Sequence, residues 1–400
     1  MLKGKHIILG VTGGIAAYKS VFLLRLLVKA GAEVQVIMTP SAKQFVAPLT
    51  FSTLSGKPVI SEFFTANTGQ WNSHVDLGLW ADAMIIAPAT ASTIGKMANG
   101  IADNMLVTTY LSAKSQVFVA PAMDLDMMRH PSTTRNIALL REYGNIIIEP
   151  AEGELASHLT GKGRMEEPEN IIRVISDYFA PKDLKGTHML ITAGPTYEKI
   201  DPVRFIGNYS SGKMGYAIAE EAARRGAEVT IVSGPTGIRP VRNSIRVINV
   251  ESANQMLENC VREFGNADCA VMCAAVADYA PEKSAMTKIK REHEEVPVIR
   301  LVKNPDIAAT LGSIKRPGQV IVGFALETDH EDDNAVEKLA RKHLDMIVLN
   351  SLRDKGAGFG TDTNKVTIFK ADGTSRQFPL KSKDEVASDI IDTIVAMKNA

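Results

Sequence analysis

Apolar residues recur along the chain in one pattern that appears twice: a short apolar run, a turn with glycine, a helical stripe and a second apolar run. The first copy has its runs at residues 6–10 (HIILG) and 34–38 (VQVIM), and the second copy begins at residues 188–192 (HMLIT). Uninterrupted short runs are typical of buried parallel strands, and spacings of three and four residues indicate a helix. Each copy therefore predicts a strand–helix–strand unit. The helical stripes are Leu23, Leu24, Leu27 and Val28 in the first copy, and Met214, Ala217, Ile218 and Ala222 in the second.

Two such units in a chain of 400 residues predict two domains, since single hydrophobic cores seldom grow beyond roughly 250 residues. Both domains are expected to be α/β, each with a doubly wound, Rossmann-like sheet. Residues 180–186 (APKDLKG) are polar and interrupted by proline, as linkers tend to be. We therefore expect an N-terminal domain at residues 1–180 and a C-terminal domain at residues 186–400.

The charge balance and the cysteines narrow the class of protein. Lys plus Arg and Asp plus Glu both number 45, so the formal net charge is zero. A nucleic acid or an anionic membrane as main partner would favour a basic surplus, so neither is expected. The three cysteines form no CxxC pair, and so few cysteines fit a reducing compartment. With no secretory pattern and no apolar run near the roughly 20 residues of a membrane helix, we expect a cytoplasmic enzyme.

Ligands of doubly wound sheets bind beyond the carboxyl ends of the strands, so chemistry is expected in the segments that follow the predicted strands. Gly13-Gly14 follows the first strand and opens a helix, where backbone N–H groups can hold a phosphate. Neither half has GxGxxG in this position, which disfavours a dinucleotide and leaves a mononucleotide such as FMN open. Further candidate loops lie at residues 88–96 and 121–124.

Five motifs occur in order between residue 5 and about residue 175: GVTGGIAAYK, SHVDLGLWAD, APATASTIGKMANGIADNML, PAMDLDM and GKGRM. Together they resemble the homo-oligomeric flavin-containing cysteine decarboxylases, which implies a flavodoxin-like flavoprotein domain that binds FMN. That family oxidises the substrate thiol with FMN so that CO2 can leave, and members in coenzyme A synthesis then reduce the enethiol. The resemblance implies that His74 is the active-site base, because an imidazole takes up and releases protons near neutral pH. It implies FMN contacts at Gly14, Thr39, Ser92 and Asn104, in a site formed between subunits, commonly of trimers.

Two positions depart from this family's pattern. Asp124 stands where the family usually has an Asn that touches the substrate carboxylate, and two carboxylates in hydrogen-bond range repel each other. We therefore expect Asp124 either to have a raised pKa or to contact another group. Ser157 stands where the family usually has a Cys that donates a proton in the reductive step. We hypothesise that water, His158 or another donor replaces that thiol.

The second half has candidate sites of its own. Residues 210–212 (SSG) precede a predicted helix and form an anion-site candidate, although the spacing is not that of a P-loop. An apolar run at residues 268–277 predicts a buried strand, in which Cys269 and Cys273 are interpreted as structural thiols rather than nucleophiles.

Lysines of the second half leave two interpretations open. The polar segment that follows Asp278 runs to about residue 294 and carries Lys283, Lys288, Lys290 and Arg291. It is either a solvated loop or a lid that brings lysines to phosphates. Lys338 and Lys342 fall on one face of a predicted helix, where they are either a solubilising stripe or contacts to a triphosphate.

Further motifs of this half occur in the order AGPTYE, DPVRFIGNYSSGKMG, AAVADYAP, KNPDI and GFALET. Together they resemble phosphopantothenate–cysteine ligase from residue 186 to about residue 395, and the order of the two halves matches the bifunctional bacterial enzymes of coenzyme A synthesis. The resemblance implies that CTP and Mg2+ convert 4'-phosphopantothenate into an acyl-cytidylate, which the amine of cysteine then attacks. The product would be the substrate of the first half. The base preference for CTP over ATP rests on the resemblance alone, and no metal ligand can be named.

The ligase resemblance also implies residue roles. Asn208 would contact the acyl-cytidylate, and Lys288 would stabilise charge during amide formation. Dimeric contacts are implied for this half, beside the trimeric contacts of the first, so we expect a homo-oligomer. The CTP contacts would be Asp278, Pro305, Asp306, Ile307, Ala308, Phe324, Lys338 and Lys342.

Two rival functions follow from the same residues. A nicotinamide oxidoreductase would also open with nucleotide-binding folds, but the missing GxGxxG counts against it. An active ligase fused to a regulatory flavin-binding module is the second rival, because Asp124 and Ser157 depart from the decarboxylase pattern.

Overall fold

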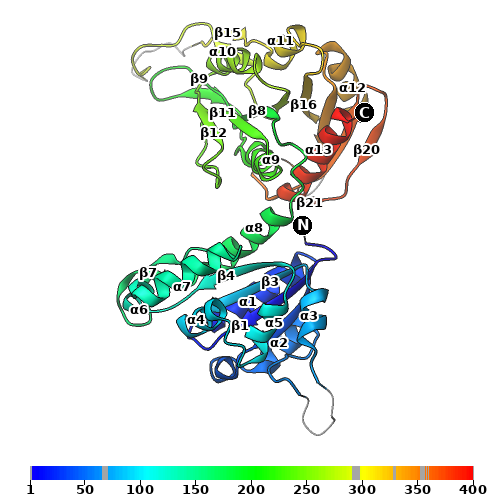
Figure 1. Ribbon diagram of the computed structural model, residues 1–400. Coiled ribbons are helices and arrows are strands. Elements are labelled where there is room, and N and C mark those ends of the chain that lie inside the picture. Colours follow the sequence, from blue (N-terminus) through cyan, green and yellow to red (C-terminus); the bar gives the residue numbers. More distant parts are fainter. Residues whose placement is uncertain are drawn as a thin grey trace. The chain divides into compact units, whose positions relative to one another are not determined.

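The computed structural model describes residues 2–64, 71–290, 298–327, 330–351, 356, 358 and 360–399. The chain divides into two compact units, the N-terminal unit Met1–Ala180 and the C-terminal unit Pro181–Ala400 (Figure 1). Both units are α/β, each with a central, mostly parallel sheet between helices, as the repeated pattern predicted. Within the described ranges, no helix combines the length and the apolar character that a membrane span requires.

A five-stranded parallel sheet lies at the centre of the N-terminal unit, in the order β2-β1-β3-β4-β5. This is the flavodoxin-like order, and it places the switch point between the neighbours β1 and β3. Helices on both faces bury the strands, which explains their uninterrupted apolar sequences. The strands are β1 (His6–Val11), β2 (Glu33–Met38), β3 (Ala83–Ala89), β4 (Gln116–Pro121) and β5 (Ile146–Ile147).

Helices α1, α2 and α8 pack on one face of this sheet, and α4, α5 and α7 pack on the other. In α1, Leu23, Leu24 and Leu27 are fully buried, as predicted. Val28 lies in the same helix as predicted, but it is at the edge of the apolar stripe and is 39% exposed. The helices are α1 (Ala17–Lys29), the 3-10 helix η1 (Pro40–Gln44), α2 (Pro48–Ser55), α3 (His74–Trp80), α4 (Ala91–Asn99), α5 (Met105–Ser112), α6 (Leu125–Arg129), α7 (Pro131–Glu142) and α8 (Pro168–Phe179).

The C-terminal unit has an eight-stranded sheet in the order β12-β11-β8-β13-β16-β17-β19-β20. The first six strands are parallel and the last two are antiparallel. The chain turns from β8 to β11 on one side and later to β13 on the other, so the switch point lies between β8 and β13. The strands are β8 (His188–Ala193), β11 (Glu228–Ser233), β12 (Arg246–Asn249), β13 (Cys269–Met272), β16 (Val320–Glu327), β17 (Met346–Ser351), β19 (Val366–Lys370) and β20 (Ser375–Gln377).

Opposite faces of this second sheet carry different helices. Helices α9 and α13 pack side by side on one face, while α10, α11 and α12 cover the other (Figure 1). In α9, Met214, Ile218 and Ala222 are buried as predicted, and Ala217 is partly buried against the same core. The helices are α9 (Lys213–Arg224), α10 (Ala253–Phe264), α11 (Ile307–Ser313), α12 (Glu331–Arg341) and α13 (Lys383–Lys398).

Short antiparallel pairs stand where the sequence predicted only loops. The glycine-rich segment 193–212 contains a hairpin of β9 (Tyr197–Lys199) and β10 (Phe205–Gly207), in which the Tyr197 and Phe205 rings stack 3.8 Å apart. The segment after Asp278 begins as a strand that pairs with a strand ending at Lys303, the first residue of the KNPDI motif. The remaining pairs are β14 (Tyr279–Pro281) with β15 (Leu301–Lys303), β6 (Ala151–Glu154) with β7 (Thr160–Arg164), and β18 (Thr363–Asn364) with β21 (Lys381–Ser382).

Two predicted boundaries were wrong for a shared reason: hydroxyl side chains take over backbone hydrogen bonds. The strand predicted over 268–277 ends at Met272, because Thr192 accepts a hydrogen bond from the N–H of Ala274 and Thr196 accepts one from that of Ala277. The loop predicted over 88–96 is reduced to Thr90, which caps α4.

Candidate functional site

The switch point of the N-terminal unit brings together the segments that follow β1 and β3. Thr12 joins them, because its hydroxyl donates to the carbonyl of Pro88 (2.7 Å) and accepts from the N–H of Thr90 (3.1 Å). Gly13 packs closely against Ser41, so that a Cβ added to Gly13 would lie 2.5 Å from the Cβ of Ser41. Gly14 faces Thr90, where an added Cβ would meet the Thr90 methyl at 3.3 Å. Side chains at these two positions would be crowded, so glycine allows the turn after β1 to pack closely against Ser41 and Thr90.

Two of the residues assigned to flavin chemistry carry buried polar atoms that have no hydrogen-bond partner. These atoms are Oγ1 of Thr39, which is 8% exposed just after β2, and Nδ1 of His74. His74 is the first residue of α3, whose N-cap Ser73 accepts from the N–H of Asp76. Buried polar atoms are rarely left unpaired. Partners from a bound ligand would satisfy both atoms, so the site fits a flavin with polar ring and phosphate groups.

Ser92 and Asn104 both lie at helix starts in the described structure. Ser92 is exposed in the first turn of α4, directly after the cap Thr90. Asn104 caps α5, since its Oδ1 accepts from the N–H of Val107 (3.1 Å). Helix starts present free N–H groups, so these positions suit contacts to anionic or polar ligand atoms.

Asp124 and Ser157 meet in the structure. The Ser157 hydroxyl donates to Oδ2 of Asp124 at 2.5 Å, while Oδ1 of Asp124 caps α6 by accepting from the N–H of Asp126. The Ser157 bond, with the backbone donors, lowers the pKa of Asp124 from its ordinary value. Of the two outcomes expected for Asp124, contact with another group is therefore the one observed, and a raised pKa is not.

The β6–β7 hairpin that carries Ser157 is seated on the segment between β4 and α6. The N–H of Met123 donates to the carbonyl of Gly163 at 3.0 Å, and an added Cβ at Gly163 would lie 2.4 Å from the Met123 carbonyl oxygen. An added Cβ at Gly161 would lie 2.7 Å from the side chain of Leu125. The glycines of the GKGRM motif therefore fix the distance between the hairpin and Asp124. His158 lies at the tip with φ 62°, and its side chain is 89% exposed.

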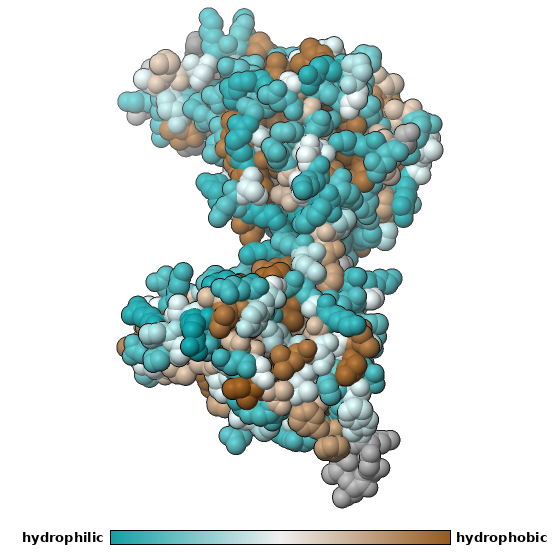
Figure 2. Space-filling view, viewed as in Figure 1, coloured by the Kyte–Doolittle hydropathy of each residue, from teal (hydrophilic) through white to brown (hydrophobic). Residues whose placement is uncertain are grey.

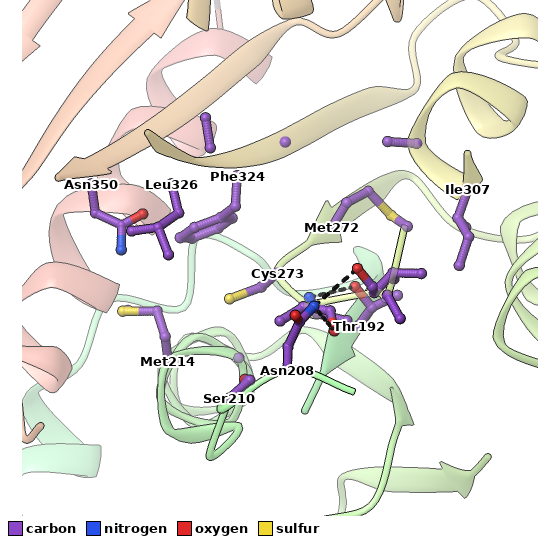
Figure 3. Close-up of a pocket in the computed structure, with 18 of the residues that line it drawn as sticks. Thr192, Asn208, Ser210, Met214, Met272, Cys273, Ile307, Phe324, Leu326 and Asn350 are labelled. Carbon is purple, nitrogen blue, oxygen red and sulfur yellow. Dashed lines mark hydrogen bonds between the residues drawn. The ribbon is translucent and has the colours of Figure 1, made fainter. Parts of the chain in front are cut away.

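A cavity of about 690 Å³ opens at the switch point of the C-terminal unit, beyond the carboxyl ends of β8, β13 and β16 (Figure 3). Phe324, Leu326 and Asn350 lie along one side in this view, and Ile307 and Met272 lie on another. Of the residues assigned to the ligase, the following line it: Asn208, Asp278, Pro305, Asp306, Ile307, Ala308, Phe324, Lys338 and Lys342.

Asn208 is oriented by the loop that leaves β13. Its side-chain amide donates to the carbonyls of Ala275 and Val276, both at 3.1 Å (Figure 3). Asn304 fixes the next part of the same loop, because its side chain donates to the carbonyl of Ala277 (2.8 Å) and its N–H to that of Asp278 (2.9 Å). The KNPDI and AAVADYAP motifs are therefore tied together through backbone carbonyls.

Asp306 connects α11 with the lysine-bearing end of α12. Its Oδ1 caps α11 through the N–H of Ala309 (3.0 Å), and its Oδ2 pairs with Nζ of Lys342 (2.9 Å). Burial alone would raise the pKa of Asp306, but the Ala309 bond and Lys342 lower it below the ordinary value. Asp306 is therefore a carboxylate at neutral pH.

Lys288 is the one assigned ligase residue that does not line the cavity. It is exposed, but the next residue, Ile289, is anchored: its N–H donates to Asp201 (3.2 Å) and its carbonyl accepts from Arg204 (2.8 Å). Asp201 and Arg204 form the turn of the β9–β10 hairpin, and their ion pair holds the pKa of Asp201 well below its usual range. Asn208 directly follows this hairpin, so Lys288 and Asn208 are attached to one small structure.

Sequence reasoning missed several polar residues of this cavity. Lys213, Lys303 and Asn304 stand inside motifs quoted above but received no role there. Asn350, Asn364 and Lys383 come from β17, β18 and the C-terminal helix, whose positions cannot be read from local patterns. Lys383 was not detectable as a site residue, because it follows β21 in a segment with an ordinary capping sequence. The missed residues are Lys213, Lys303, Asn304, Asn350, Asn364 and Lys383.

The cysteines behave as structural thiols. Cys260 and Cys269 are fully buried, and burial raises the pKa of each to about 12. Cys273 lines the cavity, and its surroundings also raise the pKa of its thiol to about 12. A neutral thiol is a poor nucleophile, so a catalytic role is not supported. Within the described part of the chain, His, Cys, Asp and Glu side chains nowhere gather in a group of three or more that could hold a metal ion.

Comparison with known families defines the class of protein first. Residues 1–180 match the family model "Flavoprotein", and residues 184–397 match the "DNA/pantothenate metabolism flavoprotein C-terminal domain". The chain is thus a flavoprotein unit joined to a unit of pantothenate metabolism. Over 400 residues it is 46% identical to the coenzyme A biosynthesis bifunctional protein CoaBC of Bacillus subtilis (strain 168), which covers 99% of this chain and 98% of that protein. The chain belongs to the CoaBC family of bifunctional enzymes of coenzyme A biosynthesis, with a flavoprotein decarboxylase half and a ligase half.

Other similarities add detail. The chain is 56% identical over 357 residues to a cysteine/cysteine sulfinic acid decarboxylase of an unknown prokaryotic organism, which covers 88% of this chain and 99% of that protein. A crystal structure of the C-terminal domain of a CoaBC protein is 44% identical, with a TM-score of 0.47, and covers 54% of this chain and 97% of that one. Family membership confirms the predicted bifunctional enzyme and counts against both the nicotinamide oxidoreductase and the purely regulatory flavin-binding half.

Proposed function

We propose that the C-terminal unit joins 4'-phosphopantothenate to cysteine at the expense of CTP, and that the N-terminal unit decarboxylates the product to 4'-phosphopantetheine with FMN. The observation that carries the proposal is the cavity at the second switch point. Nine residues assigned to this reaction from separate motifs line that one cavity of about 690 Å³. Residues spread over more than 130 positions of sequence would not be expected to converge if the motif assignment were accidental.

In the ligase half, the side chains would act mainly by positioning and charge stabilisation. Lys338 and Lys342 would attract the triphosphate. Asn208, whose side chain is held by hydrogen bonds to two backbone carbonyls, would orient the activated carboxylate. Lys288 would stabilise the charge that develops as the amine of cysteine attacks. Mg2+ would arrive with the nucleotide, because Mg2+ is commonly held by one or two carboxylates together with substrate phosphates. Asp278 and Asp306 are carboxylates that line the cavity.

In the decarboxylase half, FMN would supply the oxidation and later reduction of the substrate. Thr39 would donate to it or accept from it, because its buried hydroxyl has no other partner. Gly14, Ser92 and Asn104 would contact its polar groups from the loop after β1 and from two helix starts. His74 would move the proton of the substrate thiol, since an imidazole does so readily near neutral pH.

Ser157 would not replace the missing thiol as proton donor. Its hydroxyl is committed to Asp124, and a hydroxyl is a much weaker acid than a thiol. Water or the exposed His158 at the tip of the hairpin would donate the proton instead.

A homo-oligomer and a cytoplasmic location belong to the same proposal. Large apolar side chains of the N-terminal unit are exposed, and hydrophobic patches are visible on this unit in Figure 2. Such exposure favours contact with further copies of the chain. The three cysteines are free thiols, as a reducing compartment would keep them. The exposed residues are Ile15, Tyr18, Phe22, Leu49, Val75 and Leu79.

One incubation tests the main proposal. The purified protein is supplied with 4'-phosphopantothenate, cysteine, CTP and Mg2+, and the products are followed by mass spectrometry. We expect 4'-phosphopantetheine, pyrophosphate and CO2. Accumulation of 4'-phosphopantothenoylcysteine would contradict an active first half, and absence of pyrophosphate would contradict the ligase assignment.

Decarboxylation of free cysteine is a second candidate activity, favoured by Asp124. In the free amino acid an α-ammonium group stands beside the carboxylate, whereas in 4'-phosphopantothenoylcysteine that nitrogen is a neutral amide. The ionised Asp124 carboxylate attracts an ammonium and repels a carboxylate with no neighbouring cation. The similarity to a cysteine/cysteine sulfinic acid decarboxylase points in the same direction.

Cysteine would give cysteamine and CO2, with the two electrons removed from the thiol returned in the reductive step, so no external oxidant is needed. The test compares the wild type with Asp124→Asn on both substrates. We expect the variant to lose preference for free cysteine, with the ratio of kcat/KM values shifting about tenfold or more towards the amide substrate. An unchanged ratio, or no cysteamine from the wild type, would remove this candidate.

A further inference from the structure

Two lysines begin neighbouring helices at one end of the ligase cavity. Lys213 is the first residue of α9 and Lys383 is the first residue of α13, and both line the cavity. Helices α9 and α13 pack on the face of the sheet opposite to α11 and α12, whose caps are Asp306 and Lys342. The cavity therefore receives lysines from both sides of the sheet, and the motif assignment gave a role only to those of α12.

Lys383 is a buried cation that forms no ion pair with any described residue, although Asp362, the partner of the nearby Lys213, offsets part of its charge. It is 7% exposed, and its ammonium donates to the carbonyls of Thr361 (2.6 Å) and Gly358 (3.2 Å). Carbonyl oxygens satisfy its hydrogen bonds but cancel none of its charge. Among the described residues no carboxylate lies within ion-pair distance of it, and burial together with the nearby Lys213 lowers its pKa. Burying an unpaired charge is costly, so such residues are rarely kept without a ligand to meet them.

The start of α9 adds further positive potential at the same place. Its N-cap is Gly212, which has φ 82° and no side chain to accept from the free N–H groups of the first turn. Ser210 and Ser211, just before it, also line the cavity. Lys213 is only partly compensated, by the largely exposed Asp362 at 2.6 Å. An uncapped helix start beside two ammonium groups attracts an anion.

We propose that Lys383 is the buried cation of a phosphoryl-binding subsite that it forms with Lys213 and the uncapped start of α9. This subsite deepens the ligase function proposed above and rests on it. A phosphoryl group fits because it offers several acceptor oxygens and more than one negative charge. In the proposed reaction two substrates carry such groups, the triphosphate of CTP and the phosphate of 4'-phosphopantothenate. Two separate groups of lysines, one on each side of the sheet, match two phosphorylated substrates.

The test is Lys383→Met, which keeps the length of the side chain and removes its charge. Ligation is measured by pyrophosphate release while CTP, 4'-phosphopantothenate and cysteine are varied one at a time. We expect the KM of one phosphorylated substrate to rise about 10- to 100-fold, as for loss of one charge-assisted contact, with the KM of cysteine unchanged. Whichever KM rises identifies the source of the phosphoryl group. Inorganic phosphate and pyrophosphate serve as competing probes, and both should inhibit the variant less than the wild type.

Two further variants separate binding from a structural role. Lys381→Met removes a nearby charge that pairs with Asp389 at 2.7 Å and does not line the cavity, so all three KM values should stay at the wild-type level. Lys383→Arg keeps the charge and should restore part of the affinity. The midpoint temperature of thermal unfolding of Lys383→Met should stay close to that of the wild type. If Lys383→Met is instead destabilised, the subsite requires that Lys213→Met raise the KM of the same substrate.

Unchanged KM values for both phosphorylated substrates in Lys383→Met would overturn the subsite, as would an equal loss for all three substrates. A wild-type protein that releases no pyrophosphate would instead overturn the ligase function itself, so the two failures are distinguishable.

Discussion

The two units place their candidate sites at the same point of the same kind of sheet, yet the side chains at those points differ in character. In the N-terminal unit, the edge between β1 and β3 carries hydroxyls and an imidazole, with buried atoms of Thr39 and His74 left without partners. In the C-terminal unit, the edge between β8 and β13 opens a cavity whose lining includes Lys213, Lys342 and Lys383. The first edge offers mainly hydroxyl and imidazole groups, and the second offers several ammonium groups.

This difference shows that the doubly wound sheet decides where a ligand binds but not which ligand it is. Neutral hydroxyls and an imidazole suit a planar cofactor whose ring must be hydrogen-bonded and whose redox chemistry requires proton transfer. Convergent lysines suit substrates that carry several negative charges. A decarboxylase and a ligase can therefore share one architecture in one chain.

The largest expected effect concerns the imidazole of the first edge. His74→Asn removes the proton-transfer group, so decarboxylation should fall by about 10²- to 10⁴-fold while ligation is unchanged. CO2 release from 4'-phosphopantothenoylcysteine and pyrophosphate release measure the two activities in the same preparation. Equal loss of both activities would show that the two sites are not independent, and would contradict their treatment as separate sites with different chemistry.

The reciprocal change is Lys288→Gln in the second unit. Loss of one charge that stabilises the transition state should slow amide formation about 10²-fold, with acyl-cytidylate accumulating and decarboxylation unchanged. Quenched-flow analysis with mass spectrometry detects the intermediate. Lys283→Gln, an exposed lysine of the same segment, is the matched control and should behave as wild type. A defect as large in the control would indicate a general effect of charge in this segment.

A smaller effect is expected at Thr39. Thr39→Val keeps the shape of the side chain and removes the hydroxyl whose partner we assign to the flavin. Loss of one hydrogen bond should weaken FMN binding about tenfold, measured by flavin fluorescence after removal and re-addition of FMN. Ser115→Ala removes the other unpartnered buried hydroxyl of this unit and should leave the affinity for FMN unchanged. Tighter FMN binding by Thr39→Val would argue against the assignment.

The smallest effect is expected from the thiols. At a pKa of about 12, Cys273 holds about one thiolate per thousand molecules at pH 9, because a thiol is neutral below its pKa. Reaction of the native protein with a disulfide reagent should therefore stay slow from pH 7 to 9, and unfolding should release three reactive thiols. Rapid labelling of one thiol at pH 8 would contradict the structural interpretation and reopen Cys273 as a group of the cavity.

Much of the fold could be predicted because buried parallel strands and helical stripes leave strong local patterns. The stripe in α1 and the two strand–helix–strand openings are examples. The hairpin of β9 and β10 was missed because its three-residue strands carry no period, and the end of β13 was missed because Thr192 and Thr196 substitute for strand partners from far along the chain.

The residues of the candidate sites also fall into those that the sequence could identify and those that it could not. Residues in recognisable motifs, such as His74 and Phe324, could be named from the sequence. Lys383 could not, because its role depends on tertiary packing that brings α13 beside α9 and on burial that no local pattern encodes. The contact between Asp124 and Ser157 was likewise beyond the sequence, since 33 positions separate the two residues and only the hairpin seated on Met123 brings them together.

The turn formed by Asp201 and Arg204 has a consequence for how the ligase half can vary. It fastens the backbone next to Lys288 and also shapes the hairpin that leads into Asn208, although neither of its side chains lines the cavity. A substitution at Asp201 would therefore disturb activation of the acid and attack by the amine together, and would be mistaken for damage to the site itself.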